Sequence, residues 1–163
     1  MRRREFLCAA AVGTLASGES ESNVAALRVN GKEAAVFHYG SKWDKPFLYP
    51  IRTVSGAVLS RGFPLETVVG EQTDHAWHRG FWYGHGIVNG QDFWRELPDG
   101  KSGKLIVEGA PKLRKRGGSA AVSASMKMAP PAGKPLGTVR QAFEIEDRGS
   151  LRFIDADIAI EAD

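Results

Sequence analysis

One short stretch of the sequence, residues 74–94, carries most of the side chains that could do chemistry. Three of the chain's four histidines and three of its four tryptophans fall within it. They are His75, His78 and His85, and Trp77, Trp82 and Trp94. Imidazole titrates near neutral pH and is the commonest metal-ligand side chain, and indole offers a large apolar face with one polar N–H. We therefore take this stretch as the candidate functional site.

The spacing of the histidines leaves their geometry open. His75 and His78 are three residues apart, so they cannot point to the same face of a regular strand, where same-face residues are two apart. A loop or bulge could bring them together, and a further turn would be needed to add His85. Asp74 or Asp92 could then serve as a ligand, or as the acceptor that orients an imidazole.

Under one interpretation, the stretch binds a saccharide or another small polar molecule. Trp82 or Trp94 would stack on the apolar face of a sugar ring, and polar side chains would orient its hydroxyls. The residues for that second role are Arg79, Asn89 and Asp92. The three histidines would form hydrogen bonds and act as general acids or bases, because an imidazole has an unperturbed pKa of about 6.5.

Two other interpretations use the same residues differently. In the first, His75, His78 and His85 bind a transition metal such as zinc, iron, copper or nickel, and the protein is a metal-dependent oxidoreductase. In the second, the aromatic side chains belong to the core and the histidines are hydrogen-bonded within a glycine-rich turn region. The protein would then be a non-catalytic binding or structural module. The sequence alone leaves all three open.

The segments that would position this stretch show the periodicity of strands. Apolar and polar residues alternate over residues 122–128, 139–146 and 154–161, and no convincing helical stripe occurs. Asp-Arg-Gly-Ser at 147–150 predicts a turn, and Asn30-Gly31 predicts a two-residue hairpin. We therefore expect an all-β fold, an antiparallel β-sandwich. The side chains predicted to face its core are Val139, Phe143, Ile145, Ile154, Ile158 and Ile160.

The chain begins with the features of an export signal. Arg2, Arg3 and Arg4 precede a short apolar run at about residues 6–16, and small residues follow it. Arg-Arg-Glu-Phe-Leu also resembles the twin-arginine signal, with an ordinary Sec leader as the alternative. We expect residues 1–18 to be removed during export to the periplasm or the medium, and residues 19–163 to form the β-sandwich domain.

Charge and hydropathy argue against two classes of partner. The formal charge is +3, and removing residues 1–18 takes away three arginines and one glutamate, which leaves about +1. The basic run at 112–116 has no interleaved aromatic residue and is predicted to be a solvated loop, not a nucleic-acid surface. No apolar run reaches the roughly 18 residues of a membrane span. Cys8 is the only cysteine, so the mature domain would have no disulfide and no thiol chemistry.

The last strand pattern stops at Asp163 without a polar tail. Because a strand needs a neighbour in its sheet, we expect the domain to continue beyond this residue. The alternative is that the strand lies at a sheet edge.

Three segments resemble a known family. Residues 45–50 (Lys-Pro-Phe-Leu-Tyr-Pro), 61–64 (Arg-Gly-Phe-Pro) and 74–94 are similar to the PmoA-like family of exported bacterial proteins, often labelled methane oxygenase PmoA. The resemblance covers about residues 24–163. The positions that match the family pattern are His75, His78, Arg79, His85, Gly86, Asn89, Gly90, Asp92, Phe93 and Trp94. Ala76 and Trp77 depart from it, because many members have Pro-His there.

The resemblance implies a fold and limits the chemistry. It implies a β-sandwich similar to the mutarotase-like sugar-binding sandwiches of bacteria that degrade polysaccharides, in a domain that continues beyond Asp163. If the second histidine is a ligand in other members, Trp77 weakens the metal interpretation here. The resemblance does not imply a membrane methane monooxygenase subunit, because that protein spans the bilayer several times and this chain has no span after its leader.

Overall fold

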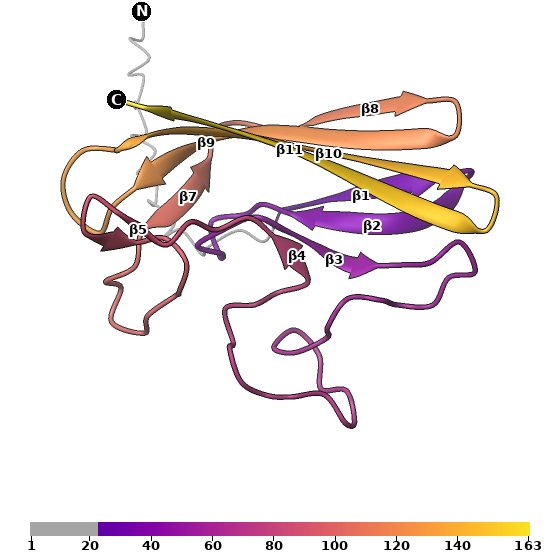
Figure 1. Ribbon diagram of the computed structural model, residues 1–163, viewed down its shortest axis with the longest axis horizontal. Helices are drawn as coiled ribbons and strands as arrows, with labels where there is room; N and C mark the ends of the chain where they lie inside the picture. The colour runs from indigo at the N-terminus through magenta and orange to yellow at the C-terminus, as the bar shows by residue number, and fades with distance from the viewer. Residues whose placement is uncertain (1–22) are drawn as a thin grey trace, which may run out of the picture.

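The computed structural model describes residues 23–163, and in this range the chain consists of strands and loops, with no helix (Figure 1). It therefore contains no helix that could cross a membrane within the described range. All strand pairs are antiparallel, and the strands form two layers that face each other. The all-β sandwich predicted from the sequence is confirmed. The predicted export signal, residues 1–18, lies outside the described residues.

The first layer is a four-stranded sheet with the order β1-β2-β3-β4. Its strands are β1 (Val24–Val29), β2 (Lys32–His38), β3 (Phe47–Ile51) and β4 (Phe81–Trp82). The predicted Asn30-Gly31 turn joins β1 to β2. Both residues have positive φ, 50° and 79°, as the favoured two-residue hairpin turn requires.

The second layer has the order β11-β10-β9-β7, and β8 also pairs with β9. Its strands are β7 (Lys104–Val107), β8 (Lys112–Arg116), β9 (Ser119–Ala129), β10 (Gly137–Arg148) and β11 (Leu151–Ala162). The short pair β5 (Ile87–Val88) and β6 (Gln91–Asp92) stands apart from both layers. The prediction of a loop at 112–116 is wrong, because this solvated basic run forms strand β8, which pairs with β9.

The core lies between the layers, where β1 packs across β9 and β10. Its largest fully buried side chains come from both sheets: Leu27, Val29, Phe37, Leu48, Val122, Phe143 and Ile145. A second cluster forms around Phe93, which follows β6, and contains Leu105, Met126, Met128 and Val139. Because burying one such side chain stabilises a fold by about 1.5–3 kcal/mol, Phe93 is a strong anchor for the site stretch.

The predicted inward face is confirmed on β10 and only partly on β11. Val139, Phe143 and Ile145 are at most 2% exposed. Ile154 and Ile158 are only half-buried, and the prediction for Ile160 is wrong, because its side chain is 47% exposed. The reason is the strand order, since β11 is an outer strand with β10 as its one neighbour among the described strands.

Candidate functional site

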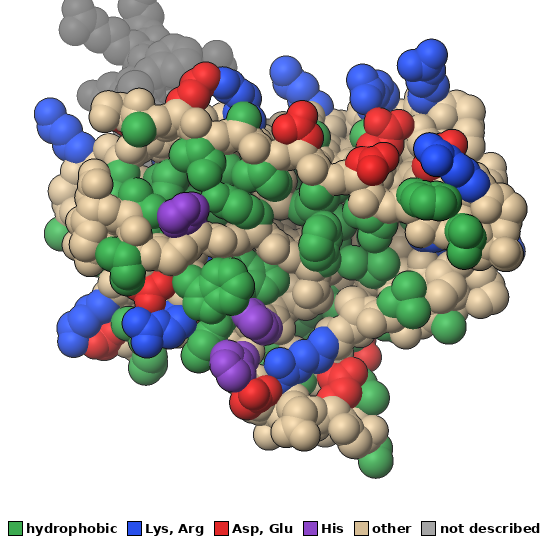
Figure 2. Space-filling model, viewed as in Figure 1, with side chains coloured by type: hydrophobic (Ala, Val, Ile, Leu, Met, Phe, Trp, Pro, Cys, Tyr) green, Lys and Arg blue, Asp and Glu red, His purple; other side chains and the backbone are tan. Residues whose placement is uncertain are grey.

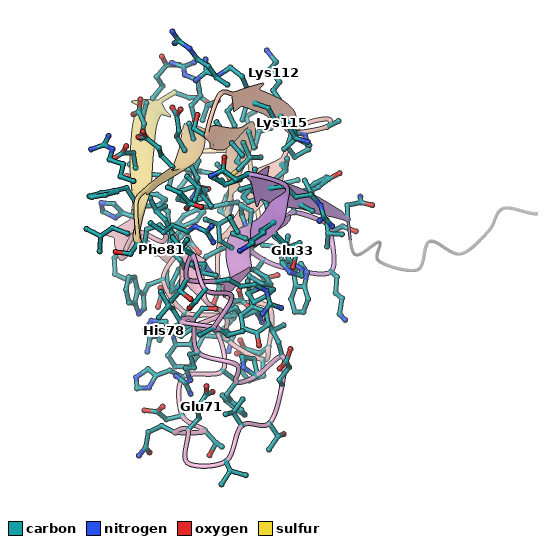
Figure 3. The ribbon with its side chains drawn as sticks, turned by 90° about the vertical axis from the view of Figure 1, so that its right-hand side faces the viewer. Glu33, Glu71, His78, Phe81, Lys112 and Lys115 are labelled. Atoms are coloured by element: carbon teal, nitrogen blue, oxygen red, sulfur yellow. The ribbon has the colours of Figure 1, made fainter. Side chains whose placement is uncertain are left out.

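A long loop between β3 and β4 delivers the first part of the site stretch. β4 pairs with β3 through Phe47↔Trp82 and Leu48↔Phe81, so Trp82 is held by the edge of the first sheet. Gly80, just before β4, has a φ of +56°, and a Cβ there would lie 2.2 Å from the carbonyl oxygen of Leu48. Only glycine allows this approach of the loop to β3. In Figure 3, His78 lies between Phe81, at the sheet, and Glu71, farther out on the loop.

Side chains fix the outer part of this loop. Glu71 accepts hydrogen bonds from the backbone amides of Gly62 and Phe63 at 2.9–3.0 Å, and these bonds hold the pKa of its carboxyl below the usual value. Arg61 donates to the carbonyl oxygens of Gln72 and Asp74. These bonds tie residues 61–63 to residues 71–74, so the chain enters the site stretch from a fixed direction.

Five aromatic rings form a contact chain from the loop to the hairpin. The imidazoles of His75 and His78 stack with centroids 5.6 Å apart. His78 lies 5.3 Å from the Trp82 ring and 5.4 Å from the Trp94 ring, and the two indoles are 4.9 Å apart at an angle of 47°. Trp77 lies against His75 at 5.2 Å. We call these five residues the His–Trp cluster.

Asp74 and His75 form a hydrogen-bonded pair at the border of the His–Trp cluster. His75 Nδ1 lies 2.6 Å from Asp74 Oδ2, and Arg61 Nη2 lies 3.2 Å from Asp74 Oδ1. The bond to His75 and the charge of Arg61 hold the pKa of the Asp74 carboxyl below its usual value. Since an ionised carboxylate only accepts hydrogen bonds, His75 donates through Nδ1, and its Nε2 is the nitrogen that can meet a ligand.

His78 is the inner histidine of the His–Trp cluster. Its Nε2 is buried and has no hydrogen-bond partner within residues 23–163. Burial lowers the pKa of His78, and the nearby His75 and Arg61 lower it further. The imidazole is therefore neutral near pH 7, and it packs between His75 and the two indoles as an uncharged ring.

A layer of largely buried charged side chains supports Trp82, and no pattern in the sequence predicts it. Lys45 is 2% exposed, and its Nζ lies 5.6 Å from the Trp82 ring centre, 3.8 Å from Glu96 Oε1 and 3.3 Å from the Arg95 carbonyl oxygen. Burial lowers the pKa of Lys45, and the charge of Glu96 opposes that effect.

Arg79 completes the layer of buried charges. It donates two hydrogen bonds to Glu96 at 2.7 and 2.5 Å, and its guanidinium lies 4.7 Å from the centre of the Trp43 ring. Arg79 was predicted to orient a ligand hydroxyl. In the structure, two nitrogens of Arg79 donate hydrogen bonds to Glu96 instead. The role of Arg79 that the structure supports is therefore to balance the negative charge of Glu96 next to the His–Trp cluster.

Asp92 acts on Trp94 through the backbone. Its Oδ1 accepts hydrogen bonds from the amides of Trp94 and Arg95 at 2.7 and 3.0 Å, and its Oδ2 accepts from Arg95 Nε at 2.6 Å. Burial opposes ionisation, but these bonds outweigh it and lower the pKa of the carboxyl. Asp92 was predicted to meet a ligand, but both of its oxygens are committed to the segment that presents Trp94.

The structure does not bring the remaining predicted residues to the His–Trp cluster. Asn89 and Gly90 form the two-residue turn between β5 and β6, and Asn89 has a φ of +47°. This turn geometry accounts for the Asn-Gly pair. His85 is exposed and makes no ring contact with the other described histidines.

The predicted metal ligands do not form a shared site. Within residues 23–163, no group of three or more His, Cys, Asp or Glu side chains is placed to hold a metal ion. A transition-metal centre built on His75, His78 and His85 therefore does not fit the residues as they stand, because His85 is absent from the cluster of rings.

Two hollows of the described surface lie away from the His–Trp cluster. One, of about 350 Å³, crosses the outer face of β8–β11 and is lined by residues such as Ser123, Arg140 and Asp157. The other, of about 290 Å³, lies between β7 and the segment around Trp43. The His–Trp cluster itself forms an exposed face, on which Trp94 is 42% exposed (Figure 2).

Comparison with known proteins places the chain in a family. Residues 25–163 match a family described as "Family of unknown function (DUF6807)". The chain belongs to the DUF6807 family. No curated protein and no solved structure matches it. The DUF6807 match carries no link to PmoA-like proteins, so that resemblance stays a prediction.

Proposed function

We propose that this DUF6807 domain binds a saccharide on the exposed face of the His–Trp cluster. The observation that carries the proposal is the pair of neighbouring indoles, Trp82 and Trp94, with a polar border at Asp74 and His75. A sugar ring has a C–H face, which suits an indole, and hydroxyls around its rim, which suit a carboxylate and an imidazole. The two kinds of group stand side by side here.

Residues beneath the indoles favour binding without rearrangement. Lys45 and Glu96 support Trp82, and Asp92 fixes the backbone of Trp94. Gly84 leaves room for the Trp82 ring, because a Cβ at Gly84 would lie 2.0 Å from it. A face that is already ordered loses less entropy when a ligand binds.

The open shape of the His–Trp cluster favours one kind of saccharide. The side chains of His75 and Trp94 are 51% and 42% exposed, so a ligand that meets them would lie across the surface. An oligosaccharide can cover both indoles with successive rings. We accordingly favour a polymeric saccharide outside the cytoplasm, in line with the leader expected at residues 1–18.

Acid–base chemistry on the bound sugar is a second candidate, and the Asp74–His75 pair favours it. With Nδ1 donating to Asp74, the Nε2 of His75 could take a proton from a hydroxyl and return it. His78 would stay neutral beside it, because burial lowers its pKa. The oxidoreductase interpretation gains no such support, since the three histidines do not gather around one point.

Calorimetric titration of the full chain with a panel of oligosaccharides tests the proposal. We expect binding to at least one of them, and a loss of at least about tenfold in affinity on Trp94→Ala, as for a stacking aromatic side chain. Phe153→Ala is the matched control, because Phe153 is 38% exposed on β11 and outside the cluster. Retained affinity in Trp94→Ala, or no binding to any saccharide, would overturn the proposal, and stoichiometric metal in the untagged protein would revive the oxidoreductase interpretation.

A further inference from the structure

The hollow of about 350 Å³ on the outer face of the second layer has a floor of short side chains. Buried and half-buried residues alternate along most of β9, so Ser123 and Ser125 face outward. The outward residue of β10 that pairs with Ser123 is Ala142. Because these side chains are short while Lys112 and Arg140 at the rim are long, the sheet is hollowed at this point.

The register of the strands places a basic side chain on each side of the floor. Lys112 of β8 pairs with Ser123, and Arg140 of β10 pairs with Ser125. Paired residues of neighbouring strands lie on the same face of a sheet. Since β8 and β10 lie on opposite sides of β9, a ligand seated over the two serines would have a cation on either side.

These four side chains have binding capacity left within residues 23–163. Lys112 is exposed and forms no ion pair there, and the hydroxyls of Ser123 and Ser125 form no hydrogen bond. Arg140 meets only Glu161, through Nη2, so its Nη1 and Nε can still donate. The hollow therefore offers an ammonium, part of a guanidinium and two hydroxyls to a ligand.

Two acidic side chains also line the hollow, and their positions orient a charged ligand. Glu108 forms an ion pair with Lys127 at 2.9 Å, which balances its charge. Asp157 pairs with Ala142, so it stands on the far side of β10 from Lys112. An anionic group of the ligand is thus attracted to the β8 side, and a carboxylate at the β11 side can accept hydrogen bonds from hydroxyls.

The positive charge continues along β8 beyond the hollow. All five residues of β8 are exposed, and Arg114, Lys115 and Arg116 are basic like Lys112. Among these four, only Arg114 has an acidic partner in the described part of the chain, Glu144 at 3.7 Å. A chain-like ligand with several negative charges could therefore extend from the hollow along this strand.

This surface is separate from the His–Trp cluster and differs from it in composition. Figure 3 shows Lys112 and Lys115 at the opposite end of the molecule from His78. No aromatic side chain is among the described residues that line the hollow. Single-stranded nucleic acids gain much of their affinity by stacking bases on aromatic rings. The lining therefore suits a ligand that is rich in hydroxyls and carboxylates, and not one that stacks.

We propose that this hollow, with β8 beside it, binds an acidic saccharide whose sugar rings carry carboxylates. One carboxylate would lie between Lys112 and Arg140, and hydroxyls of the same ring would form hydrogen bonds with Ser123 and Ser125. A further carboxylate along the saccharide would meet Arg114. The inference goes beyond saccharide binding at the His–Trp cluster and does not depend on it, because it uses a different surface.

Calorimetric titration of the full chain with a tetramer of galacturonate tests the inference. The matched probe is the fully methyl-esterified tetramer, which keeps the sugar rings and loses the charges. We expect the acidic tetramer to bind at least about tenfold more tightly than the ester, and added salt to weaken its binding. Lys112→Gln/Arg140→Gln should lower the affinity for the acidic tetramer by about tenfold or more, through lost bonds to charged groups.

Two further variants separate the hollow from charge in general. Arg28→Gln/Lys101→Gln also removes two exposed positive charges, one of which is paired with an acid as Arg140 is, and it should bind like the wild type. Ser123→Leu fills the floor and leaves the charge unchanged, so it should lower the affinity by about tenfold as well. A melting curve checks that each variant folds.

Several outcomes would overturn the inference. They are equal affinity for the acidic tetramer and its ester, equal losses in Lys112→Gln/Arg140→Gln and its control, and a single-stranded tetranucleotide that binds as tightly as the acidic tetramer. The hollow variant should cause the same loss in a Trp94→Ala background, whether or not the His–Trp cluster binds a saccharide. Binding that Trp94→Ala alone abolishes would overturn the inference, because the probe would then bind only at the His–Trp cluster.

Discussion

The two halves of the described chain are ordered in different ways. From Ser119 onward, three strands of 11, 12 and 12 residues pair along their whole length. Between residues 52 and 103 the strands are two residues long, and the chain is held by hydrogen bonds from side chains such as Arg61, Glu71 and Asp92. The long strands from Ser119 onward are held by regular backbone hydrogen bonds between neighbouring strands. The segment between residues 52 and 103 is held by a few specific side chains. Substitutions should therefore have different consequences in the two halves.

Phe143 joins the two halves, and its loss should have the largest effect. Its ring lies 6.3 Å from Phe37 in the first sheet and 5.4 Å from Phe81 in β4. Phe143→Ala should lower the free energy of unfolding by about 3–5 kcal/mol, through lost burial and a cavity. The free energy of unfolding is measured by urea denaturation, monitored by circular dichroism. Phe153→Ala removes only a partly exposed ring that lies 4.7 Å from the Arg148 guanidinium, and it should change this free energy by less than about 1 kcal/mol. Equal effects of the two variants would refute the assigned faces of the sheet.

Glu96→Ala should be the next most damaging change, because it leaves Lys45 and Arg79 buried without their shared carboxylate. Breaking one side of a buried ion pair costs about 3 kcal/mol. Saccharide affinity should fall as well, since Lys45 lies against Trp82. The control is Glu108→Ala, which removes the exposed ion pair with Lys127 and should cost less than about 1 kcal/mol. A stable Glu96→Ala protein would show that the buried layer does not support the site.

Asp92→Asn should have a smaller and more local effect. The amide keeps an acceptor for the backbone but weakens the bond to Arg95, so we expect a loss of about 1–2 kcal/mol. The affinity for a saccharide should fall more than stability does, because Asp92 holds the segment of Trp94. Thermal unfolding and titration on the same sample separate the two effects, and unchanged affinity would mean that Trp94 does not depend on Asp92.

The smallest predicted effect is a dependence on pH confined to the residues that precede β7. Burial lowers the pKa of both His38 and His78 from an unfolded value of 6.5, and residues 104–163 contain no histidine. Below about pH 6.5 the unfolded chain binds more protons than the folded one, so stability falls as the pH drops from 7 to 5. His78→Asn should flatten this dependence. Hydrogen exchange should show faster opening around residues 61–94 at pH 5, and an equal change in β9 and β10 would contradict the assignment.

The contrast between the halves also explains what the sequence could predict. The alternation in residues 122–128, 139–146 and 154–161 predicts strands because each residue's face depends only on its parity. Ile160 escapes this rule, since its exposure depends on which strand lies beside β11. In the same way, β8 looked like a loop because its basic residues carry no alternation, although it pairs with β9.

Sequence reasoning identified most of the residues that gather in the His–Trp cluster, but not the contacts that hold them. The density of His and Trp pointed to residues 74–94, and His75, His78, Trp82 and Trp94 do meet. Lys45 and Glu96 lie outside that stretch, and only the folded chain brings them under Trp82. The backbone role of Asp92 leaves no mark on composition, so the sequence suggested a ligand role for it. Asn89 was also given a ligand role, although the Asn89-Gly90 pair carries the same hairpin signal that predicted the Asn30-Gly31 turn.

Nuclear magnetic resonance of the side chains tests whether a saccharide binds on the His–Trp cluster. The indole N–H signals of the four tryptophans and the imidazole signals of the four histidines are followed during titration with an oligosaccharide that calorimetry has shown to bind. We expect the signals of Trp82, Trp94 and His75 to shift, with the Nε2 of His75 changing more than its Nδ1, and the signal of Trp43 to stay unchanged. Binding that leaves Trp82 and Trp94 unchanged while other residues shift would contradict it.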